Sequence, residues 1–202
     1  KAWSYVRCLR QFVPETGTVF DIGAHHGYWT KEFARIHNGQ CRVFAFEPVT
    51  YNYSILESVV SRYKNVTAEQ YALSNTTGER DIFIPVKERG NVGLGIAHFG
   101  EETKRDYLVE SIRTITLDEY VQKKSIARID FVKCDVEGAE LLMLKGGQSC
   151  LQDFDVTILL EIDEVYTERL AYTPNDIFAF LATLGFDSYR ADFGNCSFSP
   201  VQ

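Results

Sequence analysis

The sequence lacks two features that would decide its class at once. It has no apolar run of about 20 residues, the length that a membrane-spanning helix needs. It also has no excess of positive charge, because 21 Lys and Arg stand against 28 Asp and Glu, a net charge of −7. Proteins that grip nucleic acid usually carry a basic face, since neutralising phosphates drives the binding. We therefore expect no membrane span, and we do not expect nucleic acid to be the main partner.

Informative cysteine patterns are absent as well. The five cysteines are odd in number and widely scattered, and no Cys-x-x-Cys pair or other metal-ligand spacing occurs. Cys41 and Cys134 fall at or inside apolar runs, where a free cysteine behaves as a small hydrophobic residue. This pattern favours reduced cysteines and a cytoplasmic location. The chain begins with Lys1 rather than Met, so we expect a piece of a longer protein whose targeting signals can lie outside it.

No internal repeat, low-complexity tract or linker interrupts the 202 residues, so we expect one domain over residues 1–202. Short apolar runs alternate with amphipathic stretches, a pattern typical of βαβ units and a mainly parallel sheet. We predict strands at 18–22, 41–46, 66–73, 129–134 and 156–162. Helices are predicted within 1–16, at 28–37, from a cap at Thr50 to 63, at 138–145, and after the cap Thr173. The aromatic-rich residues 186–199 are predicted to form an antiparallel hairpin.

Residues 75–113 break this alternation. They contain a turn at Thr77-Gly78, a short predicted strand at 80–85 and a glycine-spaced loop at 88–100. Binding loops favour such segments, so we expect this insertion to form part of a substrate pocket. Tyr107, Phe99 and Asn91 are candidates to line it.

A glycine-bearing turn follows the first predicted strand, in the run Asp21-Ile22-Gly23-Ala24-His25-His26-Gly27. Glycine lets the backbone approach a ligand closely, and ligands of open α/β sheets bind beyond the carboxyl ends of the strands. Glu47 closes the next predicted strand, where an acidic side chain can chelate the two hydroxyls of a ribose. A tight β–α turn, with Asp21 acting only as a helix cap, would explain the same glycines without a ligand.

The spacing of the glycines bears on which nucleoside would bind. A dinucleotide site needs Gly-x-Gly-x-x-Gly so that a pyrophosphate can rest on a helix N-terminus, and here the second glycine position holds His25. This favours a nucleoside cofactor without phosphates, such as S-adenosylmethionine.

The motifs together resemble the FkbM-type methyltransferases, in order over about three quarters of the chain. The matching runs are 20–24 with Gly27-Tyr28, Phe46-Glu47-Pro48, Tyr71-Ala72-Leu73-Ser74 with Gly78, Ile115 to Tyr120, Phe131 to Glu140 with Lys145-Gly146-Gly147, and Leu159 to Ile162. The resemblance implies a Rossmann-like class I methyltransferase, an α/β fold whose mainly parallel seven-stranded sheet has helices on both faces. It implies methyl transfer from S-adenosylmethionine, most often to a hydroxyl of a sugar, polyketide or other small molecule.

The resemblance also assigns cofactor contacts. Asp21, Gly23 and Gly27 would line the methionine end, Glu47 would take the ribose, and Gln70 and Ala72 would lie near the adenine. The neighbouring motif positions Ala24, Tyr28, Pro48 and Asp135 complete the predicted set. Two positions depart from the family: His25-His26 stand where it usually has Asn and an apolar residue, and Gln70 stands where Asn is common.

Methyl transfer to an alcohol needs an aligned nucleophile and a base or a metal ion. Asp135, at the end of the fourth predicted strand, is the first candidate base, with Glu161 and His25 as alternatives. Asp135 and Glu137 can instead cap the following helix, because acids favour that end. His98 is expected to be a solvated loop residue, and Lys133 to point away from the site. No fixed metal motif occurs, although Asp135, Glu161 and Asp163 could supply oxygen ligands.

Three other functions remain open. A nicotinamide-dependent oxidoreductase would need the pattern Gly-x-Gly-x-x-Gly, which the turn after the first predicted strand does not have. An RNA ribose methyltransferase would need a lysine where the fifth predicted strand ends in Glu161-Ile162-Asp163, and the charge balance opposes it. A non-catalytic binding module would be expected to have lost Asp21, the glycines or Glu47. The acceptor and the oligomeric state cannot be read from the sequence.

Overall fold

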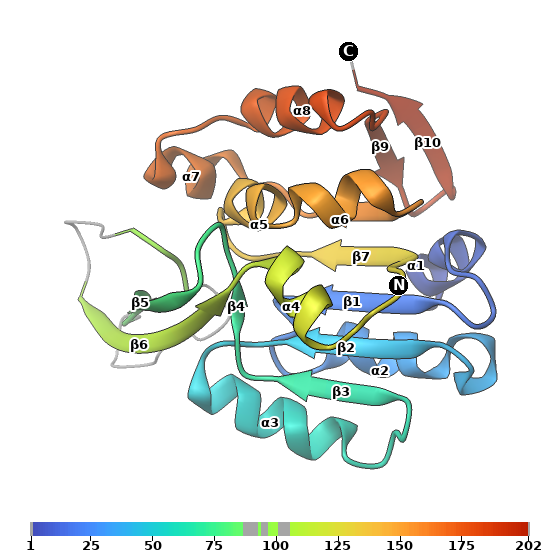
Figure 1. Ribbon diagram of the computed structural model, residues 1–202, viewed down its shortest axis with the longest axis horizontal. Coiled ribbons are helices and arrows are strands. Elements are labelled where there is room, and N and C mark those ends of the chain that lie inside the picture. Colours follow the sequence, from blue (N-terminus) through green and yellow to red (C-terminus); the bar gives the residue numbers. More distant parts are fainter. Residues whose placement is uncertain (1, 87–92, 94–96, 101–105, 202) are drawn as a thin grey trace.

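The computed structural model describes residues 2–86, 93, 97–100 and 106–201, with side chains from residue 5 onward. Its core is a parallel sheet of five strands in the order β3-β2-β1-β7-β8 (Figure 1). The strands are β1 (Thr18–Ile22), β2 (Arg42–Phe46), β3 (Val66–Glu69), β7 (Phe131–Cys134) and β8 (Thr157–Leu160). The predicted Rossmann-like fold is confirmed, but the predicted count of seven strands is too high, because the remaining strands pair in two other sheets.

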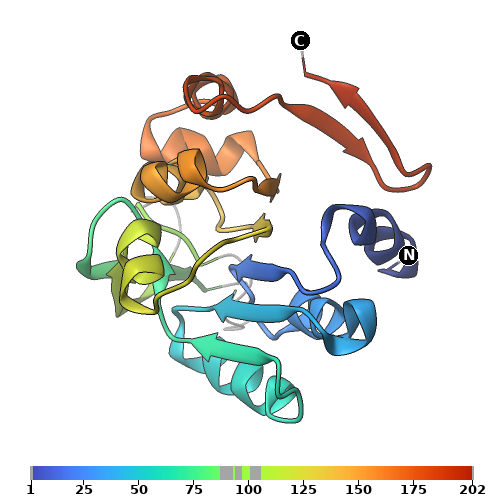
Figure 2. The ribbon, with the colours of Figure 1, turned by 45° about the vertical axis from the view of Figure 1, so that its right-hand side comes forward.

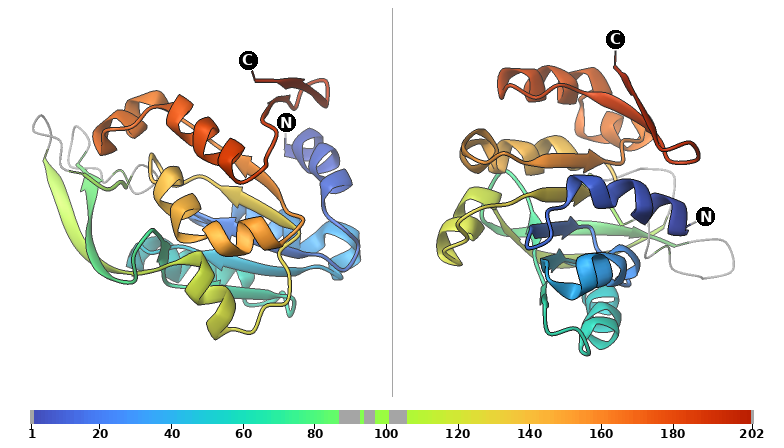
Figure 3. Two further views of the ribbon diagram at one scale, coloured as in Figure 1. Left: turned by 45° about the horizontal axis from the view of Figure 1, so that its top comes forward. Right: turned by 90° about the vertical axis from the view of Figure 1, so that its right-hand side faces the viewer.

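Helices cover both faces of this sheet (Figure 3, right). The first three helices lie on one face: α1 (Ala2–Leu9), α2 (Tyr28–Arg35) and α3 (Thr50–Val60). The opposite face carries α4 (Leu117–Lys123), α5 (Glu140–Gly146), α6 (Gln148–Asp153) and α8 (Pro174–Thr183). Side chains alternate along β1, since Val19 packs into the cluster with Phe33 of α2 whereas Phe20 and Ile22 pack with Tyr120 of α4. Burial on both faces explains why β1, β2 and β7 are mostly apolar along their length.

A second sheet lies beyond the carboxyl ends of the parallel strands (Figure 1). It contains β4 (Ala72–Leu73), β5 (Gly78–Pro85) and β6 (Tyr107–Ile115), in the order β4-β6-β5. The predicted strand at 66–73 therefore splits, because β3 belongs to the first sheet and β4 to the second. The predicted insertion 75–113 forms most of a long antiparallel pair, from Gly78 opposite Thr114 to Pro85 opposite Tyr107. β6 was not predicted from the sequence, and its exposed positions include the apolar Leu108 and Val109 as well as Ser111 and Arg113.

Two predicted helix starts have different outcomes. The cap at Thr173 is confirmed, since the Thr173 hydroxyl and the Asp176 carboxylate form a capping box before α8. The cap at Thr50 is wrong: Thr50 is the first residue of α3, Val49 stands at the cap position, and the Thr50 hydroxyl donates to Glu110 on β6 at 2.5 Å. A contact between α3 and the second sheet therefore uses the hydroxyl that was predicted to cap the helix.

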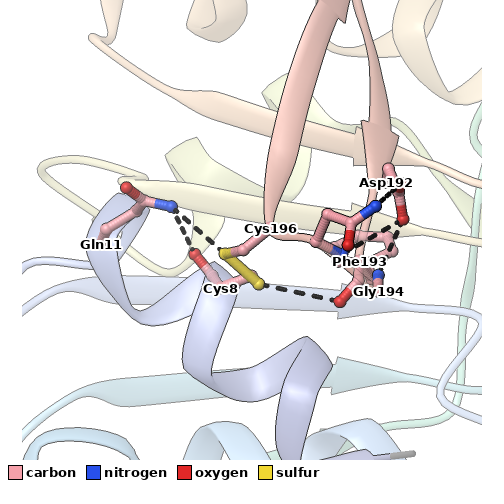
Figure 4. Close-up of a disulfide and its surroundings, with 7 residues drawn as sticks. Cys8, Gln11, Asp192, Phe193, Gly194 and Cys196 are labelled. Atoms are coloured by element: carbon pink, nitrogen blue, oxygen red, sulfur yellow. Dashed lines mark hydrogen bonds between the residues drawn. A yellow bond between two sulfur atoms is a disulfide. The ribbon is translucent and has the colours of Figure 1, made fainter.

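The C-terminal hairpin is present, as predicted, in β9 (Tyr189–Asp192) and β10 (Ser197–Pro200). It pairs with itself and lies beside α1 (Figure 2), where Phe198 contacts the ring of Phe12. A disulfide joins Cys8 of α1 to Cys196 of the hairpin turn (Figure 4). The expectation that all cysteines are reduced is therefore wrong for this pair, which is 188 residues apart in sequence and meets only in the fold. Cys41, Cys134 and Cys150 are free and buried.

Of the helices in the described ranges, none has the length and apolar character to cross a membrane.

Candidate active site

A cavity of about 360 Å³ opens at the carboxyl ends of β1, β2 and β7 and is closed on one side by the second sheet. Its walls combine the turn after β1, the end of β2, the turn after β7, and part of the predicted insertion. The insertion contributes Ile82, Ala97, His98 and Phe99. A cavity of this size, with apolar walls and a few convergent polar groups, suits a small organic ligand.

The turn after β1, residues 23–27 (the first turn below), is built from left-handed backbone and close packing. Gly23 and His25 have φ of 74° and 48°, and a Cβ on Gly23 would lie 1.8 Å from the carbonyl oxygen of Asp135. The Gly23 and Ala24 N–H groups donate to the carbonyl oxygen of Phe46 at 3.0 and 2.9 Å. Only glycine fits at position 23, because the turn and the end of β7 are in backbone contact there.

Glu47 holds this turn in place from the end of β2. One carboxylate oxygen accepts from the N–H of His25 at 2.9 Å, and the other accepts from the N–H of Val49 at 3.0 Å and from Asn52 at 3.4 Å. The side chain lines the cavity although the residue is only 5% exposed. Burial raises the pKa of Glu47 to about 7, against the opposing effect of these hydrogen bonds.

A buried lysine connects the two turns. Lys133 of β7 is 3% exposed, and its Nζ lies 3.1 Å from Asp135 Oδ2, 3.4 Å from the carbonyl oxygen of Gly23 and 3.9 Å from Asp21 Oδ1. Burial disfavours its charge, but Asp21 and then Asp135 outweigh this and raise the pKa of Lys133. Lys133 also lines the cavity, so the expectation that it points away from the site is wrong. Asp21 and Lys133 lie opposite each other on neighbouring strands and therefore share a face of the sheet.

Four of the predicted site residues lie outside the cavity lining. Asp21 is 0% exposed, because it lies inside β1, where Thr30 donates to its carboxylate at 2.5 Å. Gly27 faces α3, and a Cβ there would lie 2.9 Å from a methyl group of Leu56. The Gln70 amide donates to Thr50 at 3.0 Å, and Glu161 follows β8 on the exposed surface. The other predicted residues line the cavity: Gly23, Ala24, His25, Tyr28, Glu47, Pro48, Ala72 and Asp135.

The turn after β7, residues 135–139 (the second turn below), also uses left-handed backbone, with φ of 52° at Glu137 and 96° at Gly138. The carboxylate of Glu140, at the start of α5, accepts from the N–H groups of Val136 at 3.3 Å and Gly138 at 3.2 Å. The hydroxyl of Tyr172 donates to the carbonyl oxygen of Gly138. These bonds fix the second turn from below, since Glu140 is 0% exposed and lies outside the cavity lining.

This turn presents carboxylates to the cavity. Asp135 and Glu137 both line it, and burial together with the charges of Asp135 and Glu161 raises the pKa of Glu137 to about 7. The pKa of Glu161 is raised as well, first by Asp135. Within the described residues, no three or more His, Cys, Asp or Glu side chains are arranged to hold a metal ion. The possible ligand set of Asp135, Glu161 and Asp163 is therefore not assembled.

The histidines differ from their expected settings. His98 is 1% exposed and lines the cavity, so it is not a solvated loop residue. It is held there because its backbone pairs with Phe83 of β5. His25 stacks on His26 with ring centroids 3.8 Å apart, and burial lowers the pKa of His25. Of the other residues expected to line the pocket, Phe99 does so. Tyr107 contacts the His98 ring edge-on, and Asn91 lies outside the described residues.

Lys133 was not predicted as part of the site, whereas Glu137 and Glu140, three residues apart, were expected to share a helix face at its rim. A signal was present in the run Phe131-Val132-Lys133-Cys134, where a lysine interrupts a buried strand. A charge within a strand that is buried on both faces requires a partner. Asp21, at the matching position of the neighbouring strand, is that partner.

Comparison with known proteins agrees with this geometry. A family model described as "Methyltransferase FkbM domain" matches residues 21–188. The chain is 30% identical over 155 residues to the hexuronic acid methyltransferase AglP of Haloferax volcanii, with 76% of this chain and 59% of that protein covered. It is 27% identical to the methyltransferase sdnD of Sordaria araneosa, with 66% and 61% covered. The chain thus spans about three fifths of the length of these two relatives.

Among solved structures, the methyltransferase FkbM of Methylobacillus flagellatus superposes with a TM-score of 0.58. The match covers 88% of this chain and 40% of that one. At 18% identity this comparison establishes the shared fold.

Proposed function

The chain belongs to the family of FkbM methyltransferase domains, and from that premise we propose that it transfers a methyl group from S-adenosylmethionine to a hydroxyl of a small molecule. A sugar, a polyketide or a glycan end would be the acceptor. The observation that supports this most is the position of Glu47, which reaches the cavity at the end of β2 beside the glycine turn after β1.

The cavity residues fit S-adenosylmethionine better than a dinucleotide. Glu47 offers carboxylate oxygens that can accept from ribose hydroxyls, and Ile22, Phe46 and Leu73 give an apolar wall for an adenine ring. The first turn brings the backbone of Gly23 to the cavity where the methionine part would lie. His25 and His26 form the bend of this turn, and the His25 N–H is already bound by Glu47. The turn therefore lacks the pattern of free N–H groups that a pyrophosphate needs.

When bound, S-adenosylmethionine supplies a methyl group on a positively charged sulfur. The protein has to align an acceptor oxygen with that carbon and remove the hydroxyl proton. Asp135 and Glu137 line the cavity and could take the proton. The side chains of His98 and Phe99, from the insertion, would contact the acceptor. Aligned in this way, a hydroxyl becomes a competent nucleophile without a metal ion.

The first test is calorimetric titration with S-adenosylmethionine and S-adenosylhomocysteine, with NAD as the comparison ligand. Micromolar binding of both sulfur nucleosides, absent with NAD, is expected. Glu47→Ala should weaken it at least tenfold, because the ribose hydroxyls lose their acceptor. No binding by folded wild-type protein would contradict the proposal and would favour a non-catalytic binding module on the same fold.

A single domain over residues 1–202 and a cytoplasmic location remain predictions. The Cys8–Cys196 disulfide argues against that location, because disulfides persist mainly in oxidising compartments. Thiol counting by mass spectrometry distinguishes the cases. Protein expressed in its own host and alkylated under denaturing conditions before reduction should leave two cysteines unalkylated if the location is oxidising, and none if it is cytoplasmic.

A further inference from the structure

We propose that Glu137 is the catalytic base of this site, the group that takes the proton from the acceptor hydroxyl. The proposal rests on the proposed methyl transfer to oxygen and goes beyond the expected bases Asp135, Glu161 and His25. It follows from how the structure distributes these four side chains around the cavity.

The three expected bases are each placed less well. Asp135 has one carboxylate oxygen 3.1 Å from Lys133 Nζ, so a buried cation already occupies one of the two oxygens that could take a proton. Glu161 is exposed and outside the cavity lining. His25 belongs to the first turn, where its ring stacks on His26 and its backbone is bound by Glu47. That places it with the cofactor-binding wall.

Glu137, in contrast, lies in the cavity lining on a turn that cannot easily move. Its own backbone is left-handed, with φ of 52°, a strained conformation for a residue with a Cβ. Glu140 binds the N–H groups on both sides of it, those of Val136 and Gly138. On the far side, Gly138 packs so closely on α7 (Glu164–Thr167) that a Cβ there would lie 2.5 Å from the carbonyl oxygen of Tyr166. Strain that persists in a fixed turn is characteristic of functional positions.

The charges around Glu137 suit a base that works near neutral pH. Asp135 of its own turn, Glu161 and Asp163 after β8, and Glu140 of α5 are the carboxylates that face it. Tyr166 of α7 lies nearby, where burial and then the charge of Glu137 raise the pKa of Tyr166, and Arg169 lies over the Tyr166 ring. Lys133, the buried cation of the site, is bound to Asp135 and Asp21. With a pKa of about 7, Glu137 can both accept a proton from a hydroxyl and release it again near neutral pH.

The step is balanced without a further reactant. The acceptor oxygen forms a bond to the methyl carbon, the carbon–sulfur bond breaks, and its electron pair stays on sulfur, which becomes a neutral thioether. The hydroxyl proton passes to the Glu137 carboxylate. Its negative charge and the positive charge of the sulfonium are both neutralised, and the protonated carboxyl later releases its proton to water.

The experiment combines a titration with a rate measurement on the full chain. Protein with ¹³C-labelled glutamate carboxyls is titrated by NMR from pH 4 to 9. Two resonances are expected to titrate near pH 7, one lost in Glu137→Gln and the other in Glu47→Gln. Glu164→Gln, an exposed glutamate of α7, is the matched control and should remove neither.

Rates are measured with S-adenosylmethionine carrying a labelled methyl group, and with methyl glucopyranoside, methyl glucuronide and a mixed sugar-alcohol panel as acceptor probes. For the probe that wild-type protein methylates, Glu137→Gln should lower kcat by about 10²–10⁴-fold. It should also abolish the rise of kcat with pH through about 7. Affinity for S-adenosylhomocysteine should change by less than twofold, because Glu137 is not assigned to the cofactor.

Two results would overturn the inference while leaving the proposed function intact. One is normal binding of S-adenosylhomocysteine with no resonance near pH 7 that depends on Glu137. The other is a Glu137→Gln rate and pH profile equal to wild type. Failure of S-adenosylhomocysteine to bind wild-type protein would instead remove the proposed function itself.

Discussion

The first and second turns, after β1 and after β7, are both sharp bends held by a buried glutamate, but they present different groups to the cavity. Each bends sharply at a left-handed residue that is not glycine, His25 in one and Glu137 in the other. Each is held by a buried glutamate whose carboxylate accepts backbone N–H bonds, Glu47 in the first and Glu140 in the second. A carboxylate is well suited to this, because it accepts several hydrogen bonds at once.

The difference lies in what each turn shows to the cavity. Glu47 both holds its turn and lines the cavity, so structure and ligand contact depend on one side chain. Glu140 holds its turn from the protein interior and leaves Asp135 and Glu137 to face the cavity. The first turn thus offers the cavity mainly backbone and its supporting carboxylate. The second separates the group that supports the turn from the groups available for chemistry.

The largest expected effect comes from forcing the two turns apart. Gly23→Ala places a Cβ 1.8 Å from the carbonyl oxygen of Asp135, so one turn or both must move. We expect a loss of unfolding free energy above about 4 kcal/mol, among the largest of single substitutions, measured by urea denaturation. Gly185→Ala is the matched control, since Gly185 also has positive φ (88°) but nothing within 4 Å of the new atom. It should cost only about 1 kcal/mol. Equal losses for both variants would show that the backbone contact between the turns is unimportant.

Removing the cation between the turns should have the next largest effect. Lys133→Met leaves Asp21 buried without its ion pair, and breaking a buried pair costs about 3 kcal/mol or more. Affinity for S-adenosylhomocysteine should also fall, because the Gly23 carbonyl loses its donor. Adding Asp21→Asn to Lys133→Met should recover part of the stability, since no unpaired carboxylate then remains. Strictly additive losses in this double-mutant cycle would contradict coupling between the two residues.

Substitution of the two supporting glutamates, Glu140 and Glu47, should have smaller effects, and these should differ between the two residues. Glu140→Gln replaces one acceptor oxygen by an amide, and leaving one buried N–H unsatisfied costs about 1–3 kcal/mol. Because Glu140 does not line the cavity, stability and kcat should fall while S-adenosylhomocysteine affinity stays within about threefold. Glu47→Gln should show the reverse, with affinity falling most. Calorimetry measures the affinity of the two variants, and urea denaturation measures their stability. If both variants lost affinity and stability in the same proportion, the two glutamates would not differ in role.

The smallest effect is on the pH dependence of stability. The pKa of Glu47 is raised from 4.5 to about 7 in the folded chain, so the folded state binds its proton more tightly than the unfolded state. The stabilisation is complete below about pH 4.5 and is lost as pH rises through about 7. We expect the wild-type Tm to fall by a few degrees between pH 5 and pH 8. In Glu47→Gln this slope should become shallower, with the remainder due to Glu137, whose pKa is also raised to about 7. An unchanged slope would place the responsible group elsewhere.

Local sequence was enough to predict most of the central fold. The bounds of β1 were predicted to the residue, because a buried strand ending in Asp21-Ile22-Gly23 is a strong local signal. The start of α8 followed from the capping residues Thr173, Pro174 and Asp176. The splitting of residues 66–73 between two sheets was not predictable, since both pieces are strands and only the path of β6 decides which sheet receives Ala72 and Leu73.

The candidate site divides in the same way. Sequence by itself predicted a cavity at the strand ends with Gly23, Glu47 and Asp135 in its wall, because a parallel sheet brings these strand ends to one edge, and all three residues line the observed cavity. Only the tertiary structure decided that Asp21 is buried beneath the cavity, that Lys133 links the two turns, and that Cys8 meets Cys196. Each of these depends on which residues face one another across strands and helices far apart in the chain. Local patterns fix periodicity and turns, whereas ion pairs and covalent contacts between distant segments are fixed by packing.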